Sequence, residues 1–106
     1  MEKTTIMLAC AAGMSTSLLV TKMQEAAKNK GIDAEIFAES AGEAEKTVED
    51  KKIDILLLGP QVRFMQKQFE DKLADKGIPV AVIDMADYGM MNGQKVLDTA
   101  LELINK

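Results

Sequence analysis

The sequence predicts an α/β fold in three layers, with a four-stranded parallel sheet of order 2-1-3-4 in the middle and helices on both faces. Three observations lead to this prediction. Short apolar runs rich in strand-forming residues occur at residues 4–9, 53–58 and 79–83. The segments between them carry apolar residues at helical spacing. Strands and helices alternate along 106 residues without a break in composition, so we expect one domain spanning residues 1–106.

The expected strands differ in how their side chains alternate. Residues 4–9, 53–58 and 79–83 are almost continuously apolar, which is typical of strands buried on both faces. Residues 33–38 alternate polar and apolar side chains, which favours a strand with one exposed face. We therefore expect residues 33–38 at an edge of the sheet.

The first two helices are marked by their end signals. Gly31 is suited to end the first helix in a left-handed conformation. Ser40 with Glu43 three residues later is a capping-box pattern, which opens a short second helix through Val48. The inward face of the first helix is expected to consist of Leu18, Leu19, Met23, Ala26 and Ala27.

Two further helices follow the third and fourth strands. Pro60 suits the first turn of a helix whose inward residues are Val62, Met65, Phe69 and Leu73. A loop containing Tyr88, Gly89, Asn92 and Gly93 precedes the last helix. The apolar face of that last helix is formed by Val96, Leu97, Ala100, Leu101 and Ile104.

Composition excludes several classes of function. The formal net charge of −4 argues against nucleic-acid or anionic-membrane surfaces, which need clustered positive charge. A single cysteine excludes an internal disulfide, and the amino-terminal residues do not resemble a secretory signal, so we expect a cytoplasmic protein. No apolar run approaches the ~20 residues that span a bilayer, so no direct membrane insertion is expected. Without histidine or a dinucleotide or phosphate-loop motif, we expect no metal and no cofactor.

The segment after the first strand has the composition of an anion-binding loop. It runs from a buried strand into a helix through small and hydroxyl-bearing residues, which let backbone N–H groups point into one concavity at a helix N-terminus. We expect Ser15 or Thr16 to cap that helix. Cys10 stands at the mouth of the loop, where the same N–H groups stabilise a thiolate nucleophile. The predicted phosphate-binding residues are Ala11, Ala12, Gly13, Met14, Ser15, Thr16 and Ser17.

Other interpretations of this segment remain open at the level of residues alone. Cys10 also fits an inert, buried residue at a strand end, followed by a plain tight turn. A response-regulator receiver domain is excluded, because Gly59 stands where its third strand would end in an aspartate, and Cys10-Ala11 replace its acidic pair. A non-catalytic anion- or protein-binding module on the same fold stays possible.

Three segments together resemble a known family. CAAGMSTSLLV after the first strand, LLLGPQVRFM after the third and IDMADYG after the fourth resemble enzyme IIB of the lactose/cellobiose family of the bacterial sugar phosphotransferase system. The resemblance runs nearly end to end. It implies that Cys10 takes a phosphoryl group from a histidine of enzyme IIA and passes it to a sugar entering through the membrane enzyme IIC. Cellobiose, chitobiose or a related β-glucoside is the implied sugar.

The family's fold and loop are similar to those of low-molecular-weight tyrosine phosphatases, whose motif is C-x5-R-[ST]. Thr16 stands at the arginine position here, which argues against phosphate-ester hydrolysis. The absence of histidine agrees with a carrier, because the donor imidazole would belong to the partner. A phosphatase-like hydrolase remains an alternative. The sequence alone leaves open whether Arg63, Asp84 or Tyr88 contribute to phosphate or partner binding, and a solvated helix face, turns and loop packing are their simplest roles.

Overall fold

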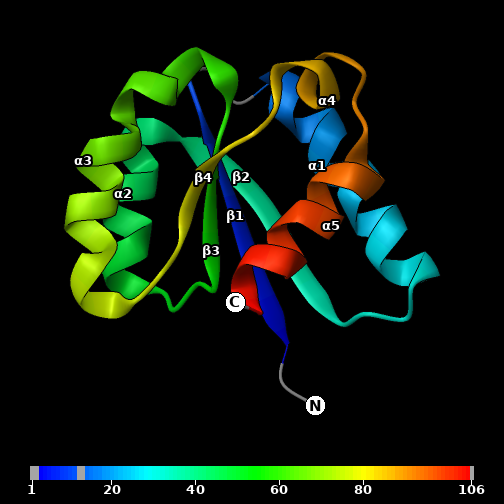
Figure 1. The fold of residues 1–106 in the computed structure, drawn as a ribbon, viewed down its shortest axis with the longest axis horizontal. Helices are drawn as coiled ribbons and strands as arrows, with labels where there is room; N and C mark the ends of the chain where they lie inside the picture. Colours follow the sequence, from blue (N-terminus) through cyan, green and yellow to red (C-terminus); the bar gives the residue numbers. More distant parts are fainter. Residues whose placement is uncertain (1–2, 12–13, 106) are drawn as a thin grey trace.

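The computed structural model describes residues 3–11 and 14–105, which form a three-layer α/β structure (Figure 1). The sheet is parallel throughout and has the order β2-β1-β3-β4, as predicted. The strand expected to have one exposed face, β2, lies at an edge. The strands are β1 (Thr4–Cys10), β2 (Ala34–Ser40), β3 (Ile55–Leu58) and β4 (Val80–Val82).

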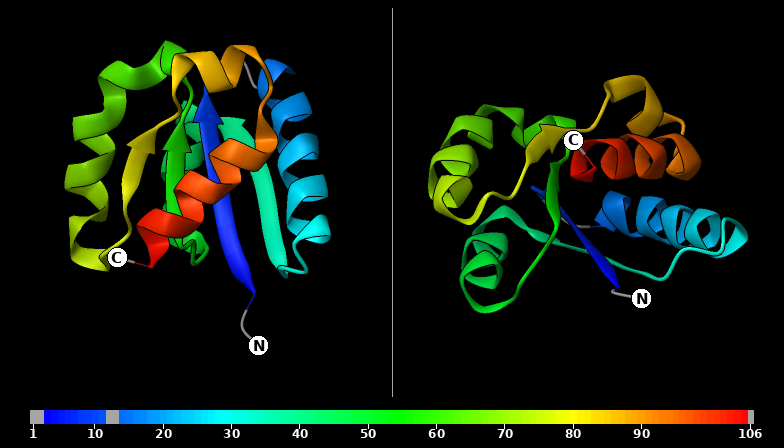
Figure 2. Two further views of the ribbon diagram at one scale, coloured as in Figure 1. Left: turned by 45° about the vertical axis from the view of Figure 1, so that its right-hand side comes forward. Right: turned by 60° about the horizontal axis from the view of Figure 1, so that its bottom comes forward.

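Helices cover both faces of the sheet, as Figure 2 shows in two views. In chain order the α-helices are α1 (Met14–Asn29), α2 (Ala41–Asp50), α3 (Gln66–Leu73), α4 (Met85–Gly89) and α5 (Gly93–Ile104). Helices α1 and α5 pack on one face and α2 and α3 on the other, because alternate residues of each strand point to opposite faces. In β1, Ile6 and Leu8 belong to the core beneath α1 and α5, whereas Met7 and Ala9 belong to the core beneath α2 and α3.

The predicted end signals of the first two helices are confirmed. Gly31 follows α1 with φ of 72°, the left-handed conformation that glycine adopts without steric cost. The Ser40 side chain accepts a hydrogen bond from the Glu43 backbone N–H at the start of α2, and its hydroxyl donates to the Glu43 carboxylate. The inward face of α1 differs at one position, because Leu18 is 51% exposed at the border of the apolar stripe.

The helix expected after Pro60 is two pieces rather than one. A 3-10 segment, η1 (Pro60–Met65), precedes α3, and Val62 has non-helical φ and ψ of −117° and 24°. This break lets Val62 point into the core with Phe69 and Leu73, while Met65 is only partly buried. The prediction of a plain loop before the last helix was wrong, because residues 85–89 form α4 there.

Candidate functional site

The carboxyl ends of β1, β3 and β4 meet at one end of the sheet. Ala9 pairs with Leu58, and Leu58 pairs with Val82, so β1, β3 and β4 end level with one another. Two backbone hydrogen bonds continue this alignment beyond the strands. The Gly59 N–H donates to the Ala9 carbonyl at 2.8 Å, and the Ile83 N–H donates to the Leu58 carbonyl at 2.8 Å. The segments after these strands are therefore held together at the end of the sheet where ligands of parallel α/β folds bind.

Cys10 is the last residue of β1 and is only 2% exposed. The end of β3 lies directly beside it. A Cβ atom added to Gly59 would stand 3.4 Å from the Cys10 Cβ and 2.9 Å from Oε1 of Gln61. The absence of a side chain at Gly59 thus leaves space for the Gln61 side chain and for Cys10.

The predicted phosphate-binding residues span the end of β1 and the first turn of α1. Ala11 and Ser17 are exposed and Thr16 is fully buried, whereas Ala12 and Gly13 lie outside the described residues. The expectation that Ser15 or Thr16 caps the helix was wrong. Helix α1 already begins at Met14, which places both residues inside its first turn. In any α-helix the N–H groups of the first turn have no partner within the helix itself, and helix N-termini are common anion-binding positions.

A buried pair of hydroxyl groups joins this first turn to α4. The side-chain oxygens of Thr16 and Tyr88 lie 3.4 Å apart, and Tyr88 is 7% exposed. The residues are 72 positions apart in sequence. Sequence reasoning left Tyr88 undecided, and the structure places its phenol against the predicted phosphate loop. The available signal was that Tyr88 is the only tyrosine of the chain and follows the fourth predicted strand.

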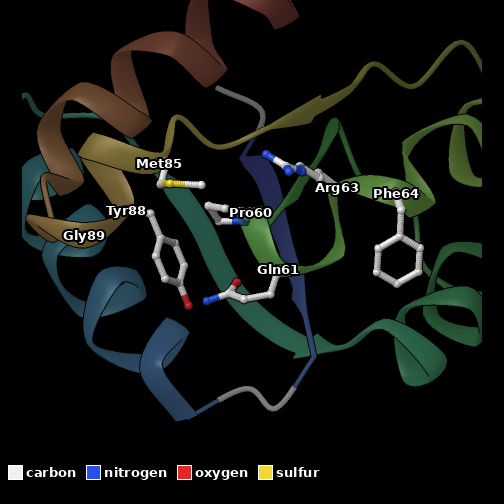
Figure 3. A pocket seen from close by; sticks show the side chains of 7 residues that line it. All are labelled: Pro60, Gln61, Arg63, Phe64, Met85, Tyr88 and Gly89. Carbon is white, nitrogen blue, oxygen red and sulfur yellow. The ribbon is translucent and has the colours of Figure 1, made fainter.

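A cavity of about 640 Å³ opens beside this pair (Figure 3). It is bounded by η1 on one side and α4 on the other. Arg63 and Phe64 are exposed at its rim, in agreement with the solvated face expected for Arg63. Its lining residues are Pro60, Gln61, Arg63, Phe64, Met85, Tyr88 and Gly89.

The two aspartates after β4 have structural contacts. Asp84 is the N-cap of α4, and its side chain accepts hydrogen bonds from the N–H groups of Ala86 at 2.8 Å and Asp87 at 3.3 Å. Asp87 is buried and pairs with Lys95 at 3.6 Å. Asp84 therefore has a structural role at the start of α4, and the contacts of Asp87 join α4 to α5.

The structure also bears on metal binding and on membrane insertion. Within residues 3–11 and 14–105, no three His, Cys, Asp or Glu side chains come together as a metal site requires. None of the helices in the described part of the chain is both long and apolar enough to cross a membrane.

Comparisons with known proteins agree with this geometry. Residues 5–99 match the family described as "PTS system, Lactose/Cellobiose specific IIB subunit". A cellobiose-specific EIIB component of this phosphotransferase system from Lactococcus lactis subsp. lactis (strain IL1403) is 53% identical over 103 residues, covering 94% of this chain and 95% of the relative. An oligo-beta-mannoside-specific EIIB component from Bacillus subtilis (strain 168) is 44% identical over 99 residues, covering 93% and 94%.

Two solved structures share the fold. The cellobiose-specific phosphotransferase IIB component from Borrelia burgdorferi is 42% identical, with a TM-score of 0.79 and coverage of 98% of this chain and 94% of that one. The lactose-specific IIB component domain from Streptococcus pneumoniae reaches a TM-score of 0.84 at 18% identity, covering 95% and 97%. The chain therefore belongs to the lactose/cellobiose-specific IIB subunit family of the sugar phosphotransferase system.

Proposed function

We propose that the protein is a phosphoryl carrier that accepts a phosphoryl group on Cys10 from a phosphohistidine of enzyme IIA and passes it to a sugar entering through enzyme IIC. One observation carries the proposal. The only cysteine of the chain ends β1 at the edge where β3 and β4 also end, directly before the segment that leads into α1. In the proposed arrangement, the N–H groups of this helix start, which have no partner within the helix itself, would receive the phosphoryl group carried by the Cys10 sulfur.

The transfer consists of two displacements at phosphorus. In the first, the Cys10 thiol loses its proton to solvent, and the sulfur attacks the phosphorus of the phosphohistidine. The S–P bond forms as the P–N bond breaks, and the bonding electron pair stays on the imidazole nitrogen. In the second, a sugar hydroxyl oxygen attacks the phosphorus and gives its proton to a base on the acceptor side. The S–P bond then breaks, with its electron pair returning to the sulfur.

The chain needs to supply little beyond position and charge stabilisation for these steps. Residues 11–17 would receive the phosphoryl oxygens through backbone N–H groups and hydroxyls, and charge-assisted hydrogen bonds of this kind contribute about 1.5–3 kcal/mol each. The chain contains no histidine, which fits a donor imidazole and an acceptor base that belong to its partners. Thr16, at the position of the phosphatase arginine, is buried against Tyr88, which supports a carrier over a hydrolase.

The surface around the site suits successive protein partners. Among side chains that the structure describes, the exposed large apolar ones belong to α1, η1 and the α4 region, next to the strand ends. In Figure 2 (left), η1, α4 and the start of α1 lie near the strand arrowheads. Flexible methionine side chains can pack against more than one partner. The exposed residues are Leu18, Phe64, Met85 and Met90.

The substrate and the setting follow from the same proposal. The relatives are described as cellobiose-, galactose- and oligo-beta-mannoside-specific. We infer that this chain serves the uptake of cellobiose, chitobiose or a related β-glucoside. Transfer of the phosphoryl group from enzyme IIA to a sugar at the membrane enzyme IIC would take place in the cytoplasm.

Reconstitution tests the proposal. Phosphorylated IIA, the chain and membrane vesicles that contain the cognate IIC should convert cellobiose to its phosphate ester. The Cys10→Ser variant, which keeps nearly the same side-chain size, should form none. In parallel, p-nitrophenyl phosphate should be hydrolysed at a negligible rate. Steady hydrolysis that disappears in Cys10→Ser would instead make the protein a phosphatase, and sugar phosphate formed by Cys10→Ser would exclude the cysteine as the carrier.

A further inference from the structure

The contact between Thr16 and Tyr88 joins the two sides of the candidate site. Thr16 lies in the first turn of α1 and is 0% exposed, and Tyr88 comes from α4. Buried hydroxyl groups need partners, since water is not available to them. The separation of 3.4 Å is longer than the ~2.8 Å usual for two hydroxyls. A small movement of either element therefore strengthens or breaks this contact.

The backbone of Tyr88 is held by contacts on both sides. Asp84 caps α4 from its N-terminal end. At the other end, Met91 has a left-handed φ of 54°, and the Asn92 N–H donates to the Asp87 carbonyl at 2.9 Å. Asp87 is in turn paired with Lys95 of α5. The phenol thus projects from a short helix, α4, whose two ends are fixed by hydrogen bonds.

The ring and the hydroxyl of Tyr88 face different surroundings. The ring lines the cavity between η1 and α4. Figure 3 shows the ring reaching down from α4, with the phenolic oxygen directed toward the start of α1 and beside the Gln61 amide. The two parts of the side chain can therefore be tested separately. Phenylalanine keeps the ring in the cavity and removes only the oxygen that contacts Thr16.

We propose that Tyr88 is a positioning residue for phosphoryl transfer, whose phenol holds Thr16 and thereby orients the first turn of α1 toward the phosphoryl group on Cys10. The inference rests on the function proposed above. The N–H groups of a first turn bind an anion only in the direction in which they point. A misplacement of about 1 Å in a transfer site can cost ~100-fold in rate. The Thr16 hydroxyl is the group of that turn with which the Tyr88 phenol interacts.

Single-oxygen substitutions test this role. Transfer from phosphorylated IIA is followed at increasing donor concentration, which gives a maximal rate and a half-saturating concentration, KM. Tyr88→Phe and Thr16→Val should each lower the maximal rate by at least ~10-fold and leave KM nearly unchanged, because the cavity wall is intact. Thr16→Ser, which keeps the oxygen, should restore the rate. The double variant Tyr88→Phe/Thr16→Val should be no slower than either single variant.

A matched control is available one turn further along α1. The Thr21 hydroxyl donates to the Ser17 carbonyl at 3.2 Å on the exposed side of the helix. Thr21→Val removes a hydroxyl from the same helix without touching Tyr88, so its transfer rate should equal that of the wild type. An effect of Thr21→Val as large as that of Thr16→Val would attribute the loss to α1 in general and overturn the proposal.

Tyr88 itself provides a readout that does not depend on phosphoryl transfer. The chain has one tyrosine and no tryptophan, so its intrinsic emission reports on this phenol. Thr16→Val should change that emission in the folded protein, and Thr21→Val should not. Unchanged emission in Thr16→Val would show that the two hydroxyls do not interact.

The positioning role and the proposed function can fail separately. Wild-type transfer rates in Tyr88→Phe would overturn the positioning role alone. A wild-type protein that is never phosphorylated on Cys10 would overturn the proposed function and the positioning role with it.

Discussion

Gly93 of α5 lies directly against the backbone of Lys22 in α1. A Cβ atom added to Gly93 would stand 2.5 Å from the Lys22 carbonyl carbon and 2.6 Å from the Met23 backbone nitrogen. Such distances are not reached in folded proteins, and backbone atoms cannot move aside as a flexible side chain can. The two helices that cover one face of the sheet therefore touch through the backbone at this point.

Gly93→Ala should consequently destabilise the fold. The added methyl group must push α5 away from α1, and overpacking of this kind costs about 1–3 kcal/mol in free energy of unfolding. Urea denaturation followed by Tyr88 emission measures the change. Gly42→Ala is the matched control, because nothing lies within 4 Å of the added Cβ in α2 and alanine favours helix by up to ~1 kcal/mol. If Gly93→Ala were as stable as Gly42→Ala, the close contact would be refuted.

The cap of α4 gives a second prediction. Asp84 accepts two backbone hydrogen bonds at the start of this five-residue helix, and α4 carries Tyr88. Asp84→Ala should lower the free energy of unfolding by about 0.5–2 kcal/mol, the usual cost of losing an N-cap. Asp84→Asn retains an acceptor oxygen and should stay within about 0.5 kcal/mol of the wild type. Equal losses in the two variants would mean that the carboxylate charge, rather than the cap, stabilises this turn.

Phe64 allows a test of the apolar surface beside the site. It is 79% exposed, so Phe64→Ser should leave the free energy of unfolding within about 0.5 kcal/mol of the wild type. If this surface receives IIA, the same change should raise KM for phosphorylated IIA about tenfold, the equivalent of ~1.4 kcal/mol. Phe64→Leu keeps an apolar side chain and should recover most of the affinity. An unchanged KM in Phe64→Ser would place the docking surface elsewhere.

The sequence was sufficient to predict the sheet. The continuous apolar runs of β1 and β3 mark strands buried on both faces, and the helices between the strands favour a parallel sheet. The same expectation was wrong for β4, which lies at an edge and is only partly buried. Gly31 and Ser40 predicted helix ends correctly, because each acts locally. Gly31 ends α1 through its left-handed backbone conformation, and Ser40 begins α2 through its side-chain hydrogen bond. Signals that are local in this sense were read correctly.

Features that depend on contacts between distant segments were missed. The break at Val62 and the short helix α4 follow from how these segments fit against the sheet, which their own composition does not encode. Leu18 was expected to be buried but is exposed. Helical periodicity identifies the apolar stripe of a helix, but it does not show where the edge of that stripe meets solvent. The contact of Thr16 with Tyr88 joins residues 72 positions apart, and a single sequence has no pattern for such a pair.

The most direct test of the account is the covalent intermediate. The chain is mixed with phosphoenolpyruvate, the general phosphotransferase proteins and its cognate IIA, and its intact mass is measured before fragmentation locates the modified residue. The account predicts one added phosphoryl group, located on Cys10, and none on a folded Cys10→Ser variant, because a serine hydroxyl is far less anionic at neutral pH. A phosphoryl group that persists in Cys10→Ser, or that maps to Ser15, Thr16 or Ser17 in the wild type, would contradict the proposed mechanism.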